Sequence, residues 1–102
     1  MMNQEQFTRI AKALADPRRF ELLEMIASDT EVACKAMVEV FPVSQATISH
    51  HLKELTTAGL IEVRREGQAG FFRVRQGVMD EYLAEIGRRL HTGASRELSS
   101  FR

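Results

Sequence analysis

The chain has 102 residues, of which 44% are hydrophobic and 27% are charged, a composition typical of one globular domain. No apolar run approaches the roughly 20 residues that a membrane-spanning helix needs, and the N-terminal residues lack the apolar segment of a signal peptide. The single cysteine cannot form an internal disulfide. We therefore expect a cytoplasmic protein without a membrane partner.

The formal net charge is zero, which by itself argues against a nucleic-acid partner, but the charges are unevenly distributed. Residues 1–43 hold five basic and seven acidic side chains, and residues 77–102 hold four of each. Residues 44–76 hold five basic side chains against three acidic ones, a local excess of two positive charges. A surface that contacts phosphates would therefore lie in the middle of the chain.

Three helices are predicted before Pro42. The first covers about 4–14, where apolar residues recur at helical spacing. Asp16 and Pro17 begin the second, because aspartate is a good N-cap and proline suits the first helical position. A third, short helix is expected over about 31–40, and it ends before the proline because the preceding residue avoids the helical region.

The segment SQATISHHLKEL, which begins at Ser44, predicts a fourth helix. Ser44 is the expected N-cap and Gly59 the expected stop. An apolar stripe recurs at Ile48, Leu52 and Leu55. Only three or four residues separate this helix from the third one, which is the spacing of a helix-turn-helix.

Residues 61–75 alternate apolar and charged side chains on either side of EGQAG, which predicts a β-hairpin with its turn at Gly67 and Gly70. A last helix is expected over about 77–91, and residues 92–102 are expected to form a flexible tail. Residues 1–91 would then form one mainly α domain with a β-hairpin wing. This architecture is the winged helix-turn-helix.

The polar face of the fourth helix is made of short side chains that are poor helix formers, unlike an ordinary solvated helix face. A helix in the major groove of DNA reads base edges through such side chains. Gln45 can pair with adenine, and Thr47 can touch a thymine methyl group. The candidate base-reading residues are Gln45, Ala46, Thr47, Ser49 and His50, with Ser44 beside them at the cap.

Phosphate contacts are expected from Lys53 on the same helix and from Arg64, Arg65 and Arg73 on the hairpin. The expected partner is double-stranded DNA. The alternative is a winged helix that docks other proteins without reading DNA. The residues at 45–53 discriminate between the two functions, because a docking module should present an apolar face there.

The segments KALADPRRFELLEMI and FPVSQATISHHLKELTTAGLIEVRREGQAGFFRV resemble the ArsR/SmtB family of bacterial winged-helix repressors, from about residue 10 to residue 75. The resemblance implies a homodimer, joined through the first and last helices, that leaves its operator when an effector binds. Such a dimer would read an inverted repeat with half-sites about 10–10.5 base pairs apart, or a multiple of that. The expected interface residues are Phe7, Ile10, Leu14, Met79, Tyr82, Leu83, Ile86 and Leu90.

The metal-binding patterns of that family are absent. Metal-sensing members often carry two cysteines in the helix before the turn, where this sequence has Ala33 and Lys35 with Cys34 between them. One thiolate does not make a zinc or arsenite site, which needs about three or four soft ligands. The family's second metal pattern, in the final helix, is broken at Tyr82 and Ala94. No metal or other cofactor is expected.

Cys34 has three interpretations: a small packing residue, a redox sensor whose thiol pKa Lys35 lowers, or a single metal ligand completed by the partner subunit. The effector is not identified by the sequence. No Ser/His/Asp set, paired carboxylates or phosphate loop is visible, so an enzyme is not expected.

Overall fold

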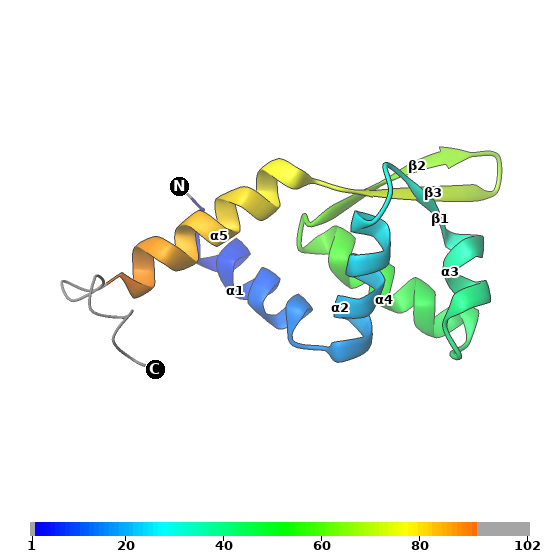
Figure 1. Ribbon diagram of the computed structural model, residues 1–102, viewed down its shortest axis with the longest axis horizontal. Coiled ribbons are helices and arrows are strands. Elements are labelled where there is room, and N and C mark those ends of the chain that lie inside the picture. Colours follow the sequence, from blue (N-terminus) through cyan, green and yellow to red (C-terminus); the bar gives the residue numbers. More distant parts are fainter. Residues whose placement is uncertain (1, 92–102) are drawn as a thin grey trace.

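Five helices and a three-stranded antiparallel sheet form the fold of the computed structural model, which describes residues 2–91 (Figure 1). The elements are α1 (Gln4–Leu14), α2 (Pro17–Ala27), β1 (Val32–Ala33), α3 (Cys34–Val40), α4 (Gln45–Thr57), β2 (Ile61–Glu66), β3 (Ala69–Val74) and α5 (Gln76–Leu90). The predicted mainly α architecture with a hairpin wing is confirmed. The predicted tail at residues 92–102 lies outside the described residues.

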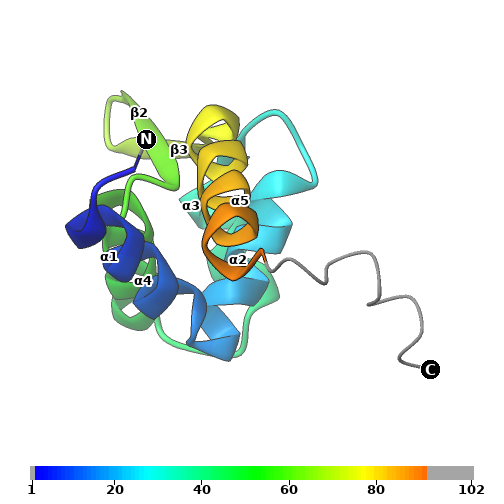
Figure 2. The same cartoon turned by 90° about the vertical axis from the view of Figure 1, so that its left-hand side faces the viewer.

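The hairpin β2–β3 projects from one end of the molecule, next to α3, and α5 extends toward the opposite end (Figure 1). Figure 2 views the molecule from that opposite end, where α1 and α5 face the reader. The elements of the helix-turn-helix are thus separated along the long axis from the C-terminal half of α5. No helix within residues 2–91 combines the length and the apolar character that crossing a membrane requires.

Helices α2 and α4 begin at the predicted N-caps. The side chain of Asp16 accepts a hydrogen bond from the backbone N–H of Arg19 at 2.9 Å, and Pro17 occupies the first helical position. The hydroxyl of Ser44 accepts one from the backbone N–H of Thr47 at 3.1 Å. Each cap stabilises its helix by about 1 kcal/mol. These local hydrogen bonds explain why both helices start where the sequence indicates.

The predicted stop of α4 is also confirmed. Gly59 has a φ of 84°, in the left-handed region that favours glycine. Its N–H donates to the carbonyl of Thr56 at 2.9 Å, and the N–H of Leu60 donates to the carbonyl of Leu55 at 3.1 Å. This pair of hydrogen bonds is a Schellman motif. It ends α4 and directs the chain into β2.

The first residues of the expected third helix form a strand instead. Val32 and Ala33 pair with Phe72 and Phe71 of β3, so the strand order is β1-β3-β2 and α3 starts only at Cys34. Valine fits a pleated, half-buried surface better than a helix, and β3 offers it a free edge. The prediction of a helix over 31–33 was therefore wrong.

The hairpin turn is shorter than EGQAG suggests. Glu66 pairs with Ala69, which leaves a two-residue loop whose first residue, Gly67, has a φ of 61°. Gly70 is not a turn residue but lies within β3, opposite Arg65. A Cβ added at Gly70 would lie 3.2 Å from Nη1 of Arg65. The absent side chain therefore leaves room for the arginine to lie across the strand.

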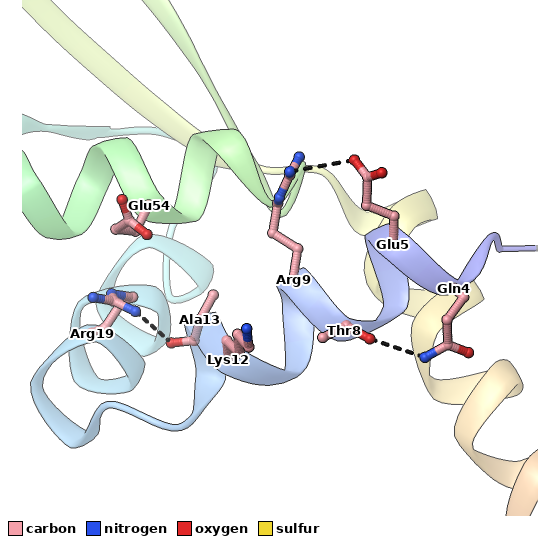
Figure 3. Close-up of a pocket in the computed structure, with 8 residues that line it drawn as sticks. All are labelled: Gln4, Glu5, Thr8, Arg9, Lys12, Ala13, Arg19 and Glu54. Carbon is pink, nitrogen blue, oxygen red and sulfur yellow. Dashed lines mark hydrogen bonds and ion pairs between the residues drawn. The ribbon is translucent and has the colours of Figure 1, made fainter.

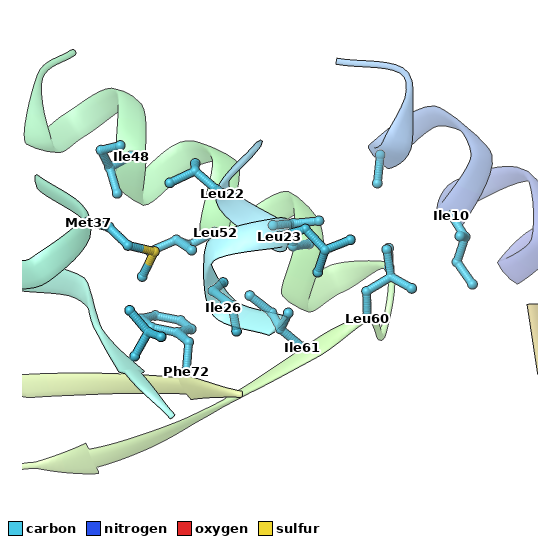
Figure 4. Close-up of a cluster of buried hydrophobic side chains, with 14 of the residues drawn as sticks. Ile10, Leu22, Leu23, Ile26, Met37, Ile48, Leu52, Leu60, Ile61 and Phe72 are labelled. Carbon is cyan, nitrogen blue, oxygen red and sulfur yellow. The ribbon is translucent and has the colours of Figure 1, made fainter. Parts of the chain in front are cut away.

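The core lies between α2, α3, α4 and the inner face of the sheet (Figure 4). Its largest fully buried side chains are Ile10, Leu22, Ile26, Met37, Ile48, Leu55, Leu60 and Ile61. Seven of them come from α1, α2, α3, α4 and β2, and Leu60 lies in the connection between α4 and β2. The orientation of α4, and so of its polar face, depends on this packing.

Replacing Ile26 with alanine should lower the free energy of unfolding by about 2–5 kcal/mol, because it removes buried methyl groups and leaves a cavity. Ile26 is 0% exposed, whereas Val40 is 63% exposed, so Val40→Ala provides the control and should change stability by less than about 0.5 kcal/mol. Urea unfolding followed by circular dichroism measures both. Equal losses in the two variants would contradict the assignment of the core.

Candidate nucleic-acid interface

The outer face of α4 carries the side chains that the sequence predicts to read DNA. Ile48, Leu52 and Leu55 point into the core and are 0–3% exposed. The exposed residues on the opposite face are Ser44, Gln45, Ala46, Thr47, Ser49, His50 and Lys53. The orientation predicted from helical spacing is thus confirmed. The face contains no large apolar side chain.

The hairpin separates its arginines onto two faces, because successive side chains of a strand alternate. Arg65 shares its face with Phe72 and lies against α3 and α4. Arg64 and Arg73 lie on the other face, beside Phe71. Only one of the three predicted hairpin phosphate contacts, Arg65, is therefore on the same side as the polar face of α4.

Arg64 and Arg73 are also held by carboxylates. Nε and Nη2 of Arg64 donate to Glu31 at 3.0 and 2.8 Å, and its Nη1 donates to Glu66 at 2.8 Å. Nε of Arg73 donates to Glu62 at 2.7 Å. The hydrogen bonds that Arg64 donates to Glu31 and Glu66 raise the pKa of Arg64, and the bond to Glu31 lowers the pKa of that carboxylate. Phosphate contacts of Arg64 and Arg73 stay a prediction, and their position and ion pairs make Arg65 the better candidate on the hairpin.

Two adjoining hollows lie between α3, α4 and the inner face of the hairpin, and we call them together the wing groove. Their volumes are about 320 and 380 Å³, and both are lined by Cys34, Ser49 and Arg65. Lys53 lines the first hollow, and Lys35 lines the second. The groove therefore joins the outer face of α4 to the hairpin and to the start of α3.

The wing groove is cationic although the chain as a whole is neutral. Lys35, Lys53 and Arg65 line it, and no carboxylate does. Within residues 2–91 none of these three forms an ion pair with a carboxylate, whereas Arg64 and Arg73 do. Cations without carboxylate partners can neutralise phosphates at no cost in existing ion pairs. This arrangement favours a nucleic-acid backbone in the groove.

Lys35 is a candidate phosphate contact that the sequence patterns did not indicate. Position 35 holds a cysteine in many metal-sensing members of the family, so the sequence patterns treat Lys35 only as a missing metal ligand. It is exposed in the first turn of α3. The first helix of a helix-turn-helix crosses the DNA backbone, and this rule is the signal that could have identified the lysine.

A second polar hollow, of about 460 Å³, lies between α1, α2 and α4 (Figure 3). Arg9, Lys12 and Arg19 line it together with Glu5 and Glu54. Arg9 forms an ion pair with Glu5 at 3.4 Å. Charges of both signs give this hollow no selectivity for anions, so it is not a candidate phosphate site.

His51 lies on the inner side of α4 and is only 8% exposed. Its Nδ1 accepts a hydrogen bond from Nε of Arg19 in α2 at 3.3 Å, which requires the neutral imidazole. Burial lowers the pKa of His51, while Asp16 opposes this effect and Arg19 adds to it. His51 is therefore a packing residue and is not part of the exposed face of α4. Its hydrogen bond with Arg19 connects α4 to α2.

Helices α1 and α5 pack within one chain through side chains that the sequence assigns to a dimer interface. The rings of Phe7 and Tyr82 lie 5.3 Å apart, and Tyr82 is 6% exposed. Ile10 is 0% exposed. Ile10 therefore has no surface to offer a partner, and its expected place in the dimer interface was wrong. Tyr82 contributes little surface for the same reason.

A buried carboxylate strengthens the contact between these helices. Glu85 is 4% exposed and accepts hydrogen bonds from Arg88 and from Nε of Arg89, the latter at 2.7 Å. Nη1 of Arg89 donates to Gln4 of α1 at 2.7 Å, and its guanidinium lies 3.8 Å from the ring centre of Phe7. The hydrogen bonds from Arg88 and Arg89 lower the pKa of Glu85. The spacing of Glu85 with Arg88 and Arg89 on one helix is a local signal for their ion pairs, whereas the contact of Arg89 with α1 joins residues 85 positions apart and has no local signal.

The remaining candidate interface residues differ in exposure. Leu83 and Leu90 of α5 are 58% and 74% exposed, and Phe20 of α2, which is not among the residues predicted from the sequence, is 43% exposed. The half-buried residues of the predicted interface are Phe7, Leu14, Met79 and Ile86. The apolar surface available to a partner is thus concentrated on one side of α5 and on Phe20.

Cys34 is half-buried at the start of α3. Within residues 2–91 no group of three or more His, Cys, Asp and Glu side chains converges in a way that could hold a metal ion. The thiol instead borders the wing groove, next to Ser49 and Arg65.

Helix α3, the turn at 41–44, α4 and the hairpin make a winged helix-turn-helix. A polar helix beside a cationic groove is typical of DNA-binding proteins of this class. A family model described as a helix-turn-helix domain matches residues 14–64. Over 79 residues the chain is 32% identical to the arsenical resistance operon repressor of Staphylococcus xylosus, across 78% of this chain and 75% of that protein. The chain belongs to the ArsR/SmtB family of winged-helix transcriptional regulators.

Solved structures have the same fold. An ArsR-like transcriptional regulator from Rhodococcus sp. RHA1 matches with a TM-score of 0.76 and 23% identity over 94% of this chain and 89% of that one. The homodimeric winged helix-turn-helix DNA-binding domain of a possible ArsR-family regulator from Mycobacterium bovis matches with a TM-score of 0.68 and 30% identity, over 89% and 93% of the two chains. The chain is a DNA-binding regulator of transcription and not an enzyme.

The stability of the protein should decrease as the pH falls below about 6.5, because the folded state lowers the pKa of His51 beneath its ordinary value of 6.5. The unfolded chain then binds a proton that the folded chain resists, so this contribution is complete above pH 6.5 and is lost below it. His51→Gln cannot be protonated and should flatten the dependence. Urea unfolding at about pH 8 and about pH 5.5 measures it. Equal pH dependence in both proteins would contradict the assignment.

Proposed function

We propose that this regulator represses transcription by placing α4 in the major groove of its operator while the wing groove holds the adjacent phosphates. The observation that carries the proposal is the set of three cations, Lys35, Lys53 and Arg65, in a groove without a carboxylate beside an exposed polar helix. A B-DNA major groove about 12 Å wide admits one helix. Such a regulator acts in the cytoplasm, where the DNA is.

Base reading is assigned to the first two turns of α4. Gln45 is exposed at the first helical position and suits the N6 and N7 edge of adenine. The hydroxyl of Thr47 lies 3.0 Å from that of Ser44, so it is engaged at the cap while its methyl group is available to thymine. Ser49 and His50 are exposed one turn further along. Ala46 leaves space for a close approach.

We also propose a homodimer. The related domain from Mycobacterium bovis is homodimeric, and in this chain Leu83 and Leu90 lie seven residues apart on α5, exposed on the same side of the helix. Burying apolar surface contributes about 25 cal/mol per Å². A second copy that covers this side of α5 would place two reading helices on one face. The operator is then an inverted repeat with half-sites about 10–10.5 base pairs apart, or a multiple of that.

The signal that releases DNA is proposed to act at the wing groove, where Cys34 is a candidate redox sensor. Attack of its thiolate on a peroxide, with release of hydroxide or an alkoxide, would leave a sulfenic acid next to Arg65 and Ser49. The added oxygen would change a half-buried contact between α3 and the hairpin. Cys34 as a packing residue remains the alternative.

Docking of another protein without DNA reading is the second candidate function, and the structure opposes it. The exposed residues of α4 from Gln45 to Lys53 are polar or small, whereas a docking surface would be apolar. The exposed large apolar side chains within residues 2–91 are Phe20, Val40, Leu83 and Leu90, all outside α4.

Arg65→Gln should weaken binding to every DNA duplex and reduce the slope of log affinity against log salt by about 0.9 for each phosphate that the variant no longer neutralises. Arg73→Gln is the matched control on the opposite face of the hairpin, where the arginine is paired with Glu62, and it should leave the slope unchanged. Fluorescence anisotropy with a random duplex over a range of salt concentrations measures both. Equal slopes in the two variants would show that the wing groove does not hold phosphates.

Gln45→Ala should reduce discrimination between the operator and unrelated DNA by about 1–3 kcal/mol, the range expected when a bidentate hydrogen-bonded pair with one base is removed. Lys53→Gln serves as the contrast, because removing a side chain that binds only phosphate weakens both duplexes equally. A duplex selected from a random library and its scrambled version provide the two ligands. A uniform decrease in affinity with Gln45→Ala would remove that residue from base reading.

Leu83→Asp should convert the dimer to a monomer at micromolar concentration, since the charge would have to be buried in an apolar contact. Val40→Asp, which changes a side chain of similar exposure on α3, should remain dimeric. Sedimentation velocity distinguishes the two states. A wild-type chain that sediments as a monomer would overturn the proposed dimer.

A further inference from the structure

The wing groove has an apolar floor that phosphates would not use. Leu52 and Phe72 form part of it and are 3% and 6% exposed, and Val63 beside them is half-buried. These side chains belong to α4, β2 and β3, so packing holds the floor in place. The hollow above it measures about 320 Å³, at the lower end of the range for small-molecule sites.

The rim above that floor is suited to one anionic group. Lys53 and Arg65 both line the hollow, together with the hydroxyl-bearing Ser49 and Thr57. The neighbouring Thr56 is different, because its hydroxyl already donates to the carbonyl of Leu52 at 2.8 Å. Because no carboxylate lines the hollow, an anion meets no side chain of like charge there.

A second apolar hollow within the described residues lacks this combination. It lies between α2 and α5, has a volume of about 360 Å³ and is lined by Phe20, Leu23 and Leu83 among others. Its one charged lining residue is Glu24, which would repel an anion. The proposed dimer would also cover Leu83. An anionic ligand should therefore bind more tightly in the wing groove than in this second hollow.

We propose that the wing groove binds a small organic anion, a carboxylate or sulfonate attached to a compact aromatic or aliphatic body, and that this ligand excludes DNA. The anionic group would take Lys53 and Arg65, and the apolar body would cover Val63 and Phe72. The exclusion rests on the proposed function, because the same two cations cannot hold a phosphate at the same time. At a free ligand concentration ten times its Kd, the apparent DNA affinity falls about 11-fold.

The position of Cys34 allows occupancy of the groove to be measured directly. It is the only cysteine of the chain and it lines the same hollow, so its rate of alkylation by iodoacetamide reports whether the groove is filled. The probe is 1-anilinonaphthalene-8-sulfonate, whose fluorescence gives its affinity. We expect saturating probe to slow alkylation several-fold in the full chain.

Two substitutions that remove the same charge from opposite faces of the hairpin provide a matched control for probe binding. Arg65→Gln should weaken probe binding about tenfold or more, the reduction expected when a charge-assisted hydrogen bond is removed. Arg73→Gln removes the same charge from the opposite face of the hairpin and should leave probe affinity unchanged. Both arginines are exposed, and circular dichroism checks that both variants fold. Alkylation that remains fast under saturating probe, or equal weakening by the two substitutions, would overturn the inference.

A random DNA duplex in the same assay separates this inference from the proposed function. Probe protection of Cys34 with no duplex binding would support the ligand site and overturn the DNA-binding role of the groove. Duplex binding without probe protection would overturn the ligand site alone. Simultaneous binding of both would overturn the exclusion, whereas displacement of the probe by the duplex supports it.

Discussion

The packing of α4 against α2 is the contact on which the other functional features depend. Leu22 and Ile26 of α2 and Ile48 of α4 have no exposed surface, so neither helix can rotate without opening the core. The hydrogen bond from Arg19 to His51 adds a polar contact between the same helices. Because one face of α4 is held in this way, the opposite face must point outward. The exposure of the polar face of α4 is a consequence of how the core packs.

The structure also explains how a chain with no net charge can present a cationic surface. The hairpin places Arg64 and Arg73 on one face, where Glu31, Glu62 and Glu66 neutralise them, and leaves Arg65 on the other. The two faces of the hairpin therefore differ in charge: the arginines on one face are neutralised, and Arg65 on the other is not paired with a carboxylate within residues 2–91. A neutral chain has little long-range attraction for DNA, so its charges act mainly after close approach.

Most features that depend on nearby residues were predictable, with the exact hairpin turn as an exception, whereas features that depend on distant residues were not. The cap at Ser44 and the stop at Gly59 act within a few residues, and the polar face of α4 follows from spacing along one helix. Val32 instead pairs with a strand 40 residues later, and Arg64 meets a carboxylate 33 residues away. The choice between Arg64 and Arg65 required knowing which face of the hairpin meets α3 and α4. No local pattern contains that information.

The connection between α4 and β2 is only three residues long, and packing and hydrogen bonds hold each of them in place. Ala58 and Leu60 are 1% and 0% exposed, Gly59 sets the direction, and the carbonyl of Leu60 accepts a hydrogen bond from Arg75 at the far end of β3. The position of the β2–β3 hairpin relative to α4 is therefore fixed. Residues 45–50 are exposed on the first turns of α4, so substitutions there alter the outward chemistry of the helix while the buried connection keeps α4 and the hairpin in the same relative position.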